Sequence, residues 1–283
     1  MKNSTVEFAV HVVRDRIGVA VTGKLGRDHK GEFCELVATD VHPNEGFQVI
    51  FRLGWRSAEA AVIFGPFSAG LIARMGQADA SARQTFATFV AAVVAKKIKV
   101  LMRVNGSEVS PLQPDSWPKE WSKLELLLRL TPFLVDTDDA AQHERLILDL
   151  VIPLFGMIVA LIGTEENELV TPGELEGEAS QVKSTRYERS RLNREACIQL
   201  KGSRCTICGF DFAEVYGPAG VGYIQVHHLK TAASLGANYR VDIAKDLEPV
   251  CANCHAMMHR ENPPITPERL RLLIEERQSK KLS

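Results

Sequence analysis

The sequence predicts an α+β protein of two domains, a larger N-terminal domain of mixed sheet and helix over 1–164 and a small metal-stapled domain over 186–283. Three observations lead to this prediction. Short β-rich runs separated by turn residues fill the first 64 residues. Two later segments, 80–95 and 140–162, are apolar in the manner of helices. Four of the six cysteines form two CxxC pairs in the C-terminal domain, a pattern typical of a zinc-stabilised fold.

The N-terminal domain is expected to begin with strands. Turn residues, among them Gly23, Gly26 and Gly54, separate the β-rich runs. The spacing is short, so antiparallel pairing is predicted. The predicted strands are Val6–Val13, Ile17–Val21, Cys34–Val41, Gln48–Leu53 and Ala61–Phe64.

Helices are predicted to follow this sheet. In Ala80–Ala95 phenylalanine and valine recur at helical spacing, and Lys99–Val104 is predicted as a strand that returns to the sheet. After three prolines, Trp121–Leu130 and Ala140–Ile162 are predicted as helices. Sheet first and helices afterwards is an α+β arrangement.

The segment 146–162 is strongly apolar and needs its own interpretation. Its 17 residues lie at the short limit for crossing a bilayer, and Asp149, Pro153 and Gly156 interrupt it. We predict a core helix, kinked and partly at a dimer interface, with a membrane anchor as the alternative. No contact with a membrane is otherwise expected.

The cysteines and the N-terminus bear on the compartment. Thiolates in CxxC pairs fit a reducing environment, and the N-terminus lacks the apolar core of a secretory signal. We therefore expect a cytoplasmic protein. Cys34 and Cys197 have no neighbour at ligand spacing, so both are predicted to be buried apolar residues.

The net charge of −1 hides an uneven distribution. Residues 1–164 carry 18 basic and 18 acidic side chains, whereas 181–283 carry 16 basic and 11 acidic ones. Between them, 165–185 is rich in glutamate and glycine and is predicted to be an acidic linker. Residues 183–204 include seven basic side chains and only two acidic ones, and the basic side chains could neutralise phosphates of a nucleic-acid backbone. The alternative is an ordinary solvated helix face.

Two CxxC pairs, Cys205 with Cys208 and Cys251 with Cys254, predict one structural zinc ion. Each knuckle presents two sulfurs, and four thiolates satisfy tetrahedral zinc. The 42 residues between the pairs exceed the spacing of about 15–20 in a plain zinc ribbon. Further structure is therefore expected inside the loop that zinc closes.

That loop and the segment after it hold a second group of ligands. His227 and His228 lie in a predicted strand, Tyr223–Leu229, and Asp246–Val250 is predicted to lead into the second knuckle. A helix starting at about Cys254 would place His255 and His259, four residues apart, on one face. A last helix, Glu268–Arg277, follows Thr266 as N-cap and Pro267 at the first helical position.

Taken together, these residues closely resemble an HNH (ββα-metal) endonuclease of the McrA-like type. Three runs carry the resemblance: Val226-His-His-Leu229, Asp246-Leu-Glu-Pro-Val-Cys251 and Cys251-Ala-Asn-Cys-His-Ala-Met-Met-His259. It covers roughly 186–277, and nothing before about residue 180 contributes to it.

The resemblance implies a role for each residue. His228 would be the general base, His227 and His255 would bind a catalytic cation, and His259 would be a third ligand or contact the scissile phosphate. Asp246 stands where the family most often has asparagine, and it would hold and polarise the base. The cation is not specified: imidazole suits Zn, Ni, Co or Mn, whereas Mg prefers oxygen.

The implied function is hydrolysis of phosphodiester bonds in DNA, with restriction of modified or foreign DNA directed by the N-terminal domain. Two other hypotheses stay open: a nuclease effector of antiphage defence gated by a signal that the N-terminal domain senses, and a zinc protein that binds DNA without cutting it. Two nuclease domains could make a double-strand break together, so a homodimer is a further expectation.

Two features of the N-terminal domain bear on DNA contact. Its one compact basic cluster is either a DNA contact or a solvated helix end; it comprises Lys96, Lys97, Lys99 and Arg103. Trp55, Trp117 and Trp121 either line a base-flipping pocket or belong to the core.

Overall fold

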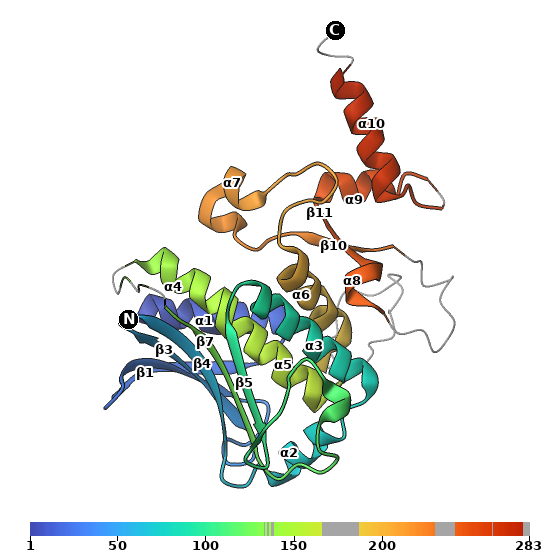
Figure 1. Cartoon of the computed structure of the whole chain (residues 1–283). Coiled ribbons are helices and arrows are strands. Elements are labelled where there is room, and N and C mark those ends of the chain that lie inside the picture. The colour runs from blue at the N-terminus through green and yellow to red at the C-terminus, as the bar shows by residue number, and fades with distance from the viewer. Residues whose placement is uncertain are drawn as a thin grey trace, which may run out of the picture. The chain divides into compact units, whose positions relative to one another are not determined.

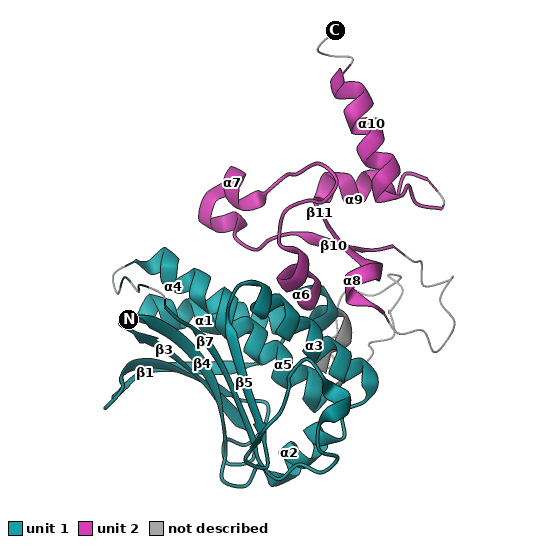
Figure 2. Ribbon diagram, in the orientation of Figure 1, with its two compact units in different colours: residues 1–195 teal, residues 196–283 magenta. Residues whose placement is uncertain are grey.

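The computed structural model describes residues 1–132, 134, 136, 139–165, 187–229, 241–261 and 263–279 (Figure 1). The chain is a mixed α+β protein, which confirms the predicted class. It forms two compact units, Met1–Glu195 and Ala196–Ser283 (Figure 2). The division falls within helix α6 (Arg189–Lys201). Apart from Glu165, the predicted linker lies outside the described residues, and the predicted boundary at 186 stays a prediction.

A seven-stranded antiparallel sheet forms the centre of the N-terminal unit, in the order β1-β2-β3-β4-β7-β5-β6. Consecutive strands β1 to β4 form a meander, and β7 inserts between β4 and β5. The strands are β1 (Val21–Asp28), β2 (Gly31–Ala38), β3 (Phe47–Gly54), β4 (Ser57–Phe64), β5 (Lys99–Val104), β6 (Ser107–Glu108) and β7 (Leu124–Leu130).

One face of this sheet carries the core. Alternate residues of β2, β3, β4 and β7 are buried, as in Leu124, Leu126 and Leu128 of β7, because side chains alternate between the two faces of a strand. Helices cover this face in Figure 1: α1 (Asn3–Ile17), α3 (Ala80–Ala95) and α5 (Ile152–Ile162), while α2 (Ala69–Gly76) lies near one end of the sheet. The ring of Phe155 on α5 lies 5.8 Å from that of Phe47 on β3.

The opposite face of the sheet is polar and carries several ion pairs. Cross-strand bridges join Arg52 to Asp28 at 2.7 Å and Arg129 to Glu59 at 2.8 Å. Lys24 pairs with Glu35 at 2.6 Å. Opposite charges therefore alternate on this face, which leaves it close to neutral.

The predicted strand Val6–Val13 is wrong, because these residues lie in helix α1. Its buried side chains include Val6, Ala9, Val13 and Ile17, whose spacing of three and four residues marks one face of a helix. Gly18, with φ of 84°, ends the helix in the left-handed region. The predicted strand Ile17–Val21 is therefore wrong as well, and β1 begins only at Val21.

The predicted helix Trp121–Leu130 is also wrong, because its second half is strand β7. The run Leu124-Glu-Leu-Leu-Leu-Arg-Leu130 buries every second residue, and β7 pairs with β4 on one side and β5 on the other. A leucine-rich run has good helix propensity, but two flanking strands outweigh it. The sheet consequently continues late in the sequence, between helices.

Several N-terminal predictions are confirmed. Ala80–Ala95 is helix α3 and Lys99–Val104 is strand β5, both at the predicted bounds. The strands predicted at 34–41, 48–53 and 61–64 correspond to β2, β3 and β4 with shifted ends.

The apolar segment 140–162 is helical as predicted. It runs through α4 (Ala140–Leu146), a π-helical turn (Ile147–Val151) and α5. Pro153 has no N–H to bond back along the helix, which accounts for the widened turn beside it. Among the described residues this is the one helix long and apolar enough to cross a membrane. It is mostly buried inside the N-terminal unit, as a core helix of a soluble protein would be.

The C-terminal unit is small and has little apolar core. Its elements after α6 are α7 (Phe212–Tyr216), a 3₁₀ turn (Gly217–Gly220), β10 (Gln225–His228), α8 (Ile243–Asp246), β11 (Leu247–Val250), α9 (Ala252–Met258) and α10 (Pro267–Ser279). Strands β10 and β11 pair antiparallel. The buried cluster comprises Ile198, Cys205, Ile207, Ile224, Val250, Cys251, Cys254, Met258 and Leu270. Three of these are cysteines, so the core depends on what the thiols bind.

Candidate metal centres

The four CxxC cysteines come together in one cluster. Their sulfurs all lie within 4.8 Å of one another, and the sulfurs of Cys208 and Cys251 are 3.7 Å apart. Three of the four are buried, while Cys208 is exposed. Four thiol sulfurs at this spacing fit a tetrahedral metal ion of the zinc type, as the sequence predicts.

Local backbone structure builds each knuckle. In the first, the N–H of Cys205 donates to the carbonyl of Phe210 at 2.9 Å and the N–H of Gly209 to the carbonyl of Cys205 at 2.9 Å. Gly209 has φ of 74°, a conformation that glycine adopts without strain. In the second, Cys251 caps α9 and its sulfur accepts from the N–H of Cys254 at 3.4 Å. These bonds direct the sulfurs inward.

The electrostatics of the cysteines suit a metal ion. Burial raises the pKa of Cys254 strongly and that of Cys208 as well. Burial also acts to raise the pKa of Cys205, but backbone N–H groups outweigh it and lower that pKa. A bound divalent cation would supply the positive charge that four crowded thiolates require.

Three histidines form a second cluster. The ring nitrogens of His227, His255 and His259 all lie within 4.8 Å of one another. Their ring centroids are 4.9 to 5.3 Å apart and the rings are steeply inclined to each other. His227 comes from β10, His255 lies in α9 and His259 is the C-cap of that helix, four residues further on, as the spacing predicts.

These rings are held in a form that can bind a cation. Burial lowers the pKa of His227 to about 4, and the charges of His255 and His259 add to this effect. Burial also lowers the pKa of His255. Neutral imidazole is the form that ligates metals, so His227 is ready to do so at neutral pH.

Gln225 is a residue of this site that the sequence analysis missed. Its Oε1 lies 2.8 Å from Nδ1 of His255. An amide oxygen can only accept, so Nδ1 carries the proton and Nε2 is left with its lone pair. Gln225 lies two residues before His227 and thus on the same face of β10, and this alternation was the one available indication.

His228 has a different environment from His227, as strand alternation predicts. It is exposed, whereas His227 is buried. Contact of its ring with surrounding protein lowers the pKa of His228, and the negative charge of Asp246 acts in the opposite direction. Asp246 therefore lies near enough to influence the ring electrostatically.

Asp246 also stabilises the local backbone structure through hydrogen bonds. It is buried at the end of α8, and its Oδ2 accepts the N–H of Asp242 at 2.7 Å. Asp242 in turn caps α8 by accepting the N–H of Ala244 at 3.1 Å. The N–H of Leu229, which follows His228, donates to the carbonyl of Asp246 at 2.8 Å. Asp246 thus fixes the chain beside His228 through its backbone and its side chain.

A cavity of about 400 Å³ adjoins the two strand histidines. Its lining includes His227, His228 and Leu229 on one side and the segment 263–268 on the other. The two prolines Pro263 and Pro264 stiffen that wall. The cavity therefore adjoins one buried histidine of the cluster and the exposed His228.

The other sequence-based sites have mixed outcomes. Trp117 and Trp121 are buried with ring centroids 5.6 Å apart, so they belong to the core, whereas Trp55 is 82% exposed. Cys34 and Cys197 are both buried, as predicted. In the basic cluster, Lys96 bonds Asp149 at 2.7 Å, which partly neutralises it.

A search for similar proteins finds no match to this chain among protein-family models, curated proteins or solved structures.

Proposed function

We propose that this chain is a metal-dependent DNA endonuclease of the HNH type. One observation carries the proposal: three histidines converge on one point, and a fourth, next to one of them in the sequence, lies on the other face of the same strand beside a buried carboxylate. A purely structural metal site has no use for the fourth histidine. Hydrolysis of a phosphodiester requires both a cation and a base.

The cation and the base would be supplied by different histidines. His227, His255 and His259 would hold a divalent cation, which when bound stabilises charge on the phosphate and the leaving oxygen. His228 is exposed and its lowered pKa keeps the ring neutral at neutral pH, so it can accept a proton from water. The charge of Asp246 favours the imidazolium that results. The four cysteines would hold zinc and stabilise the unit.

The substrate is proposed to be DNA that the N-terminal unit selects, either by a modified base or by a separate signal. The near-neutral, ion-paired face of its sheet favours the second alternative, because contact with DNA phosphates relies on an excess of Lys and Arg. A homodimer would supply two nuclease sites, one for each strand of the DNA duplex.

The test is a cleavage assay with matched plasmids and matched variants. The zinc-loaded protein is incubated with Mg²⁺, Mn²⁺, Co²⁺ or Ni²⁺ on plasmid DNA that is unmodified or carries 5-methylcytosine, 5-hydroxymethylcytosine or 6-methyladenine. His228→Ala should lose at least 10²-fold in rate while still binding the cation. His29→Ala, a change of an exposed histidine in the N-terminal unit, is the matched control and should cut normally.

The outcomes separate the hypotheses. Cutting confined to one modified plasmid supports modification-dependent restriction. Cutting of every plasmid that His228→Ala abolishes supports a nuclease gated by another signal. Binding of DNA without cutting by any metal, unchanged in His228→Ala, would show a non-catalytic zinc protein and sink the proposal.

A further inference from the structure

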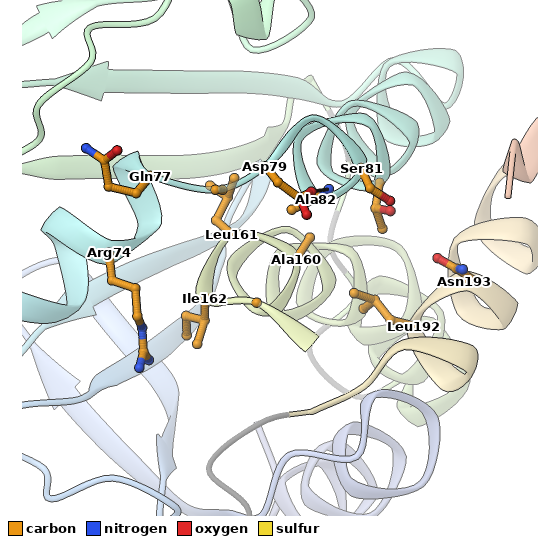
Figure 3. A pocket seen from close by; sticks show the side chains of 13 residues that line it. Arg74, Gln77, Asp79, Ser81, Ala82, Ala160, Leu161, Ile162, Leu192 and Asn193 are labelled. Atoms are coloured by element: carbon orange, nitrogen blue, oxygen red, sulfur yellow. Dashed lines mark hydrogen bonds between the residues drawn. The ribbon is translucent and has the colours of Figure 1, made fainter. Parts of the chain in front are cut away.

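Two cavities outside the histidine site differ in what lines them. In the N-terminal unit, a cavity of about 330 Å³ lies at the start of α3 (Figure 3), where the carboxylate of Asp79 caps the helix by accepting the N–H of Ala82 at 2.8 Å. The chain itself therefore satisfies that helix end. In the C-terminal unit, a groove of about 520 Å³ runs along α10, and its lining is mainly apolar.

The groove has two walls, both within the C-terminal unit. One wall is a stripe of α10 formed by Leu270, Leu273 and Ile274, whose spacing of three and four residues places them on one face of the helix. The other wall comprises Phe210 and Met257 beside the cysteine knuckles. Met257 is 49% exposed, and Leu273 and Ile274 are half-buried. The described part of the chain therefore leaves apolar side chains partly uncovered on both walls.

Two charged side chains flank this stripe. Arg269 and Glu276 are exposed, and they lie seven residues apart and therefore on one side of α10, next to Leu273. Among the described residues, neither side chain makes an ion pair. Arg271 on the same helix does have a partner, because its guanidinium donates to the carbonyl of Thr206 at 2.7 Å. One positive and one negative charge thus stand two turns apart along the edge of an apolar groove.

This charge pattern is complementary to itself when two copies of α10 pack antiparallel. With the twofold axis between Leu272 and Leu273, Arg269 of one copy faces the partner's Glu276, and Glu276 faces the partner's Arg269. In an antiparallel pair each flank of a helix meets the same flank of the other helix, so both contacts form at once.

The same axis also matches the apolar stripes. It brings the two Leu273 side chains together at the centre of the pair and sets Leu270 of each copy against the partner's Ile274. A parallel pair in register would instead place Arg277, at the end of the stripe, against the partner's Arg277, and like charges on adjacent helices repel. Charge and apolar pattern therefore favour the same antiparallel register.

We propose that this groove is the interface of a homodimer in which α10 of each copy fills the groove of the other. The occupant is a second copy of this chain, and the self-complementary charges and matching apolar stripes carry the assignment. The inference gives the expected homodimer a defined surface. It does not rest on the proposed cleavage of DNA, because pairing of the chains requires neither DNA nor a catalytic cation.

The test is the oligomeric state of the full zinc-loaded chain, measured without DNA by sedimentation velocity at about 1–100 µM protein. The parent should form a dimer as the concentration rises. Leu273→Asp should weaken the dimer at least tenfold, because it places a charge in the apolar stripe of each copy. Leu272→Asp is the matched control: Leu272 is 51% exposed and does not line the groove, so its change should leave the dimer intact.

Charge reversal tests the orientation with changes at exposed residues only. Arg269→Glu and Glu276→Arg should each weaken the dimer about tenfold, because each turns two attractive contacts into two repulsive ones. The double variant Arg269→Glu/Glu276→Arg should dimerise like the parent, and an equimolar mixture of the two single variants should form a heterodimer. Melting of each variant shows whether its fold is retained.

The proposal is overturned if the parent stays monomeric over this range, or if Leu273→Asp and the charge reversals leave a dimer unaffected, because the interface would then lie elsewhere. Single reversals that weaken the dimer without rescue in the double variant would contradict the antiparallel pairing. A monomer that dimerises only after removal of 280–283 would assign the groove to the chain's own C-terminal segment and would also overturn the proposal. None of these outcomes depends on plasmid cleavage, so the two proposals fail separately.

Discussion

At the scale of single residues, one hydrogen bond decides which nitrogen of His255 a cation can use. Gln225 accepts from Nδ1, so Nε2 is the atom left for a ligand bond. Among the described residues, the rings of His227 and His259 make no hydrogen bond of this kind, and their orientation depends on β10 and α9 themselves. Gln225 therefore orients one of the three rings of the histidine cluster.

Gln225→Leu is expected to lower the affinity of the histidine site for Co²⁺ about 10- to 100-fold, because the ring of His255 loses its acceptor and its fixed tautomer. Calorimetric titration of Co²⁺ into protein already loaded with zinc measures this. Gln278→Leu, an exposed change on α10, is the control. Equal affinities in the two variants would show that Gln225 does not orient the ligand.

The thiols are expected to fall into distinct reactivity classes. Burial raises the pKa of Cys34 to about 12, so at pH 8 roughly one molecule in ten thousand carries its thiolate. Iodoacetamide labelling read by mass spectrometry should miss Cys34 in the native protein with or without chelator. The four CxxC cysteines should become labelled once a chelator removes zinc. Denatured protein, which should label at all six, is the control; rapid native labelling of Cys34 would contradict its burial.

The grouping of the four cysteines and of His227, His255 and His259 could be predicted from the sequence because their spacing alone is informative. CxxC and a four-residue histidine spacing each fix geometry within one turn. Gln225 could not be singled out in the same way, since glutamine on a strand has no characteristic chemistry.

At the scale of elements, a helix or strand could be predicted where its local sequence preference agrees with its tertiary contacts, and was missed where the two conflict. Helix α3 was predictable because its apolar spacing is helical and no alternative partner competes. Strand β7 was not, because its leucines favour a helix locally and only pairing with β4 and β5 decides its state. Helix α1 was missed because valine-rich runs favour strands, whereas burial on one helical face outweighed that preference.

The contact between α3 and α5 gives a prediction for Gly156. A Cβ atom there would lie 2.4 Å from the ring of Phe89, which is fully buried. Gly156→Ala should therefore lower the free energy of unfolding by about 1–3 kcal/mol, despite the better helix propensity of alanine. Urea unfolding followed by circular dichroism measures the change.

Gly70→Ala on α2 is the matched control, because a Cβ there meets nothing within 4 Å. This change should be neutral or should stabilise by up to about 1 kcal/mol through helix propensity. If both variants are equally stable, α3 and α5 do not pack as closely as the distance implies.

At the scale of the whole molecule, the two units differ in what stabilises them. The N-terminal unit has a seven-stranded sheet with a helical layer on one face, which supplies a large apolar core. The C-terminal unit has nine buried apolar residues in its cluster, and three of them are cysteines. An apolar cluster this small supplies little hydrophobic stabilisation, so a bound metal ion is expected to contribute to the folding of this unit. The α+β class could be predicted from composition and periodicity, but the place of β7 beside β4 could not, because this pairing joins residues about 70 positions apart.

Removal of zinc is therefore expected to unfold the C-terminal unit and to spare the N-terminal one. Calorimetry of the zinc-loaded protein with excess chelator should show the thermal transition of the C-terminal unit lowered or lost and that of the N-terminal unit nearly unchanged. The reason is that zinc stabilises the C-terminal unit by binding only to its folded state. Cys208→Ser should have the same effect without chelator, since three thiolates bind zinc far less well than four. Cys34→Ala, which leaves the zinc ligands intact, should instead affect only the N-terminal transition. A single transition that chelator shifts as a whole would mean that the two cores unfold together, and that the zinc site stabilises the entire chain.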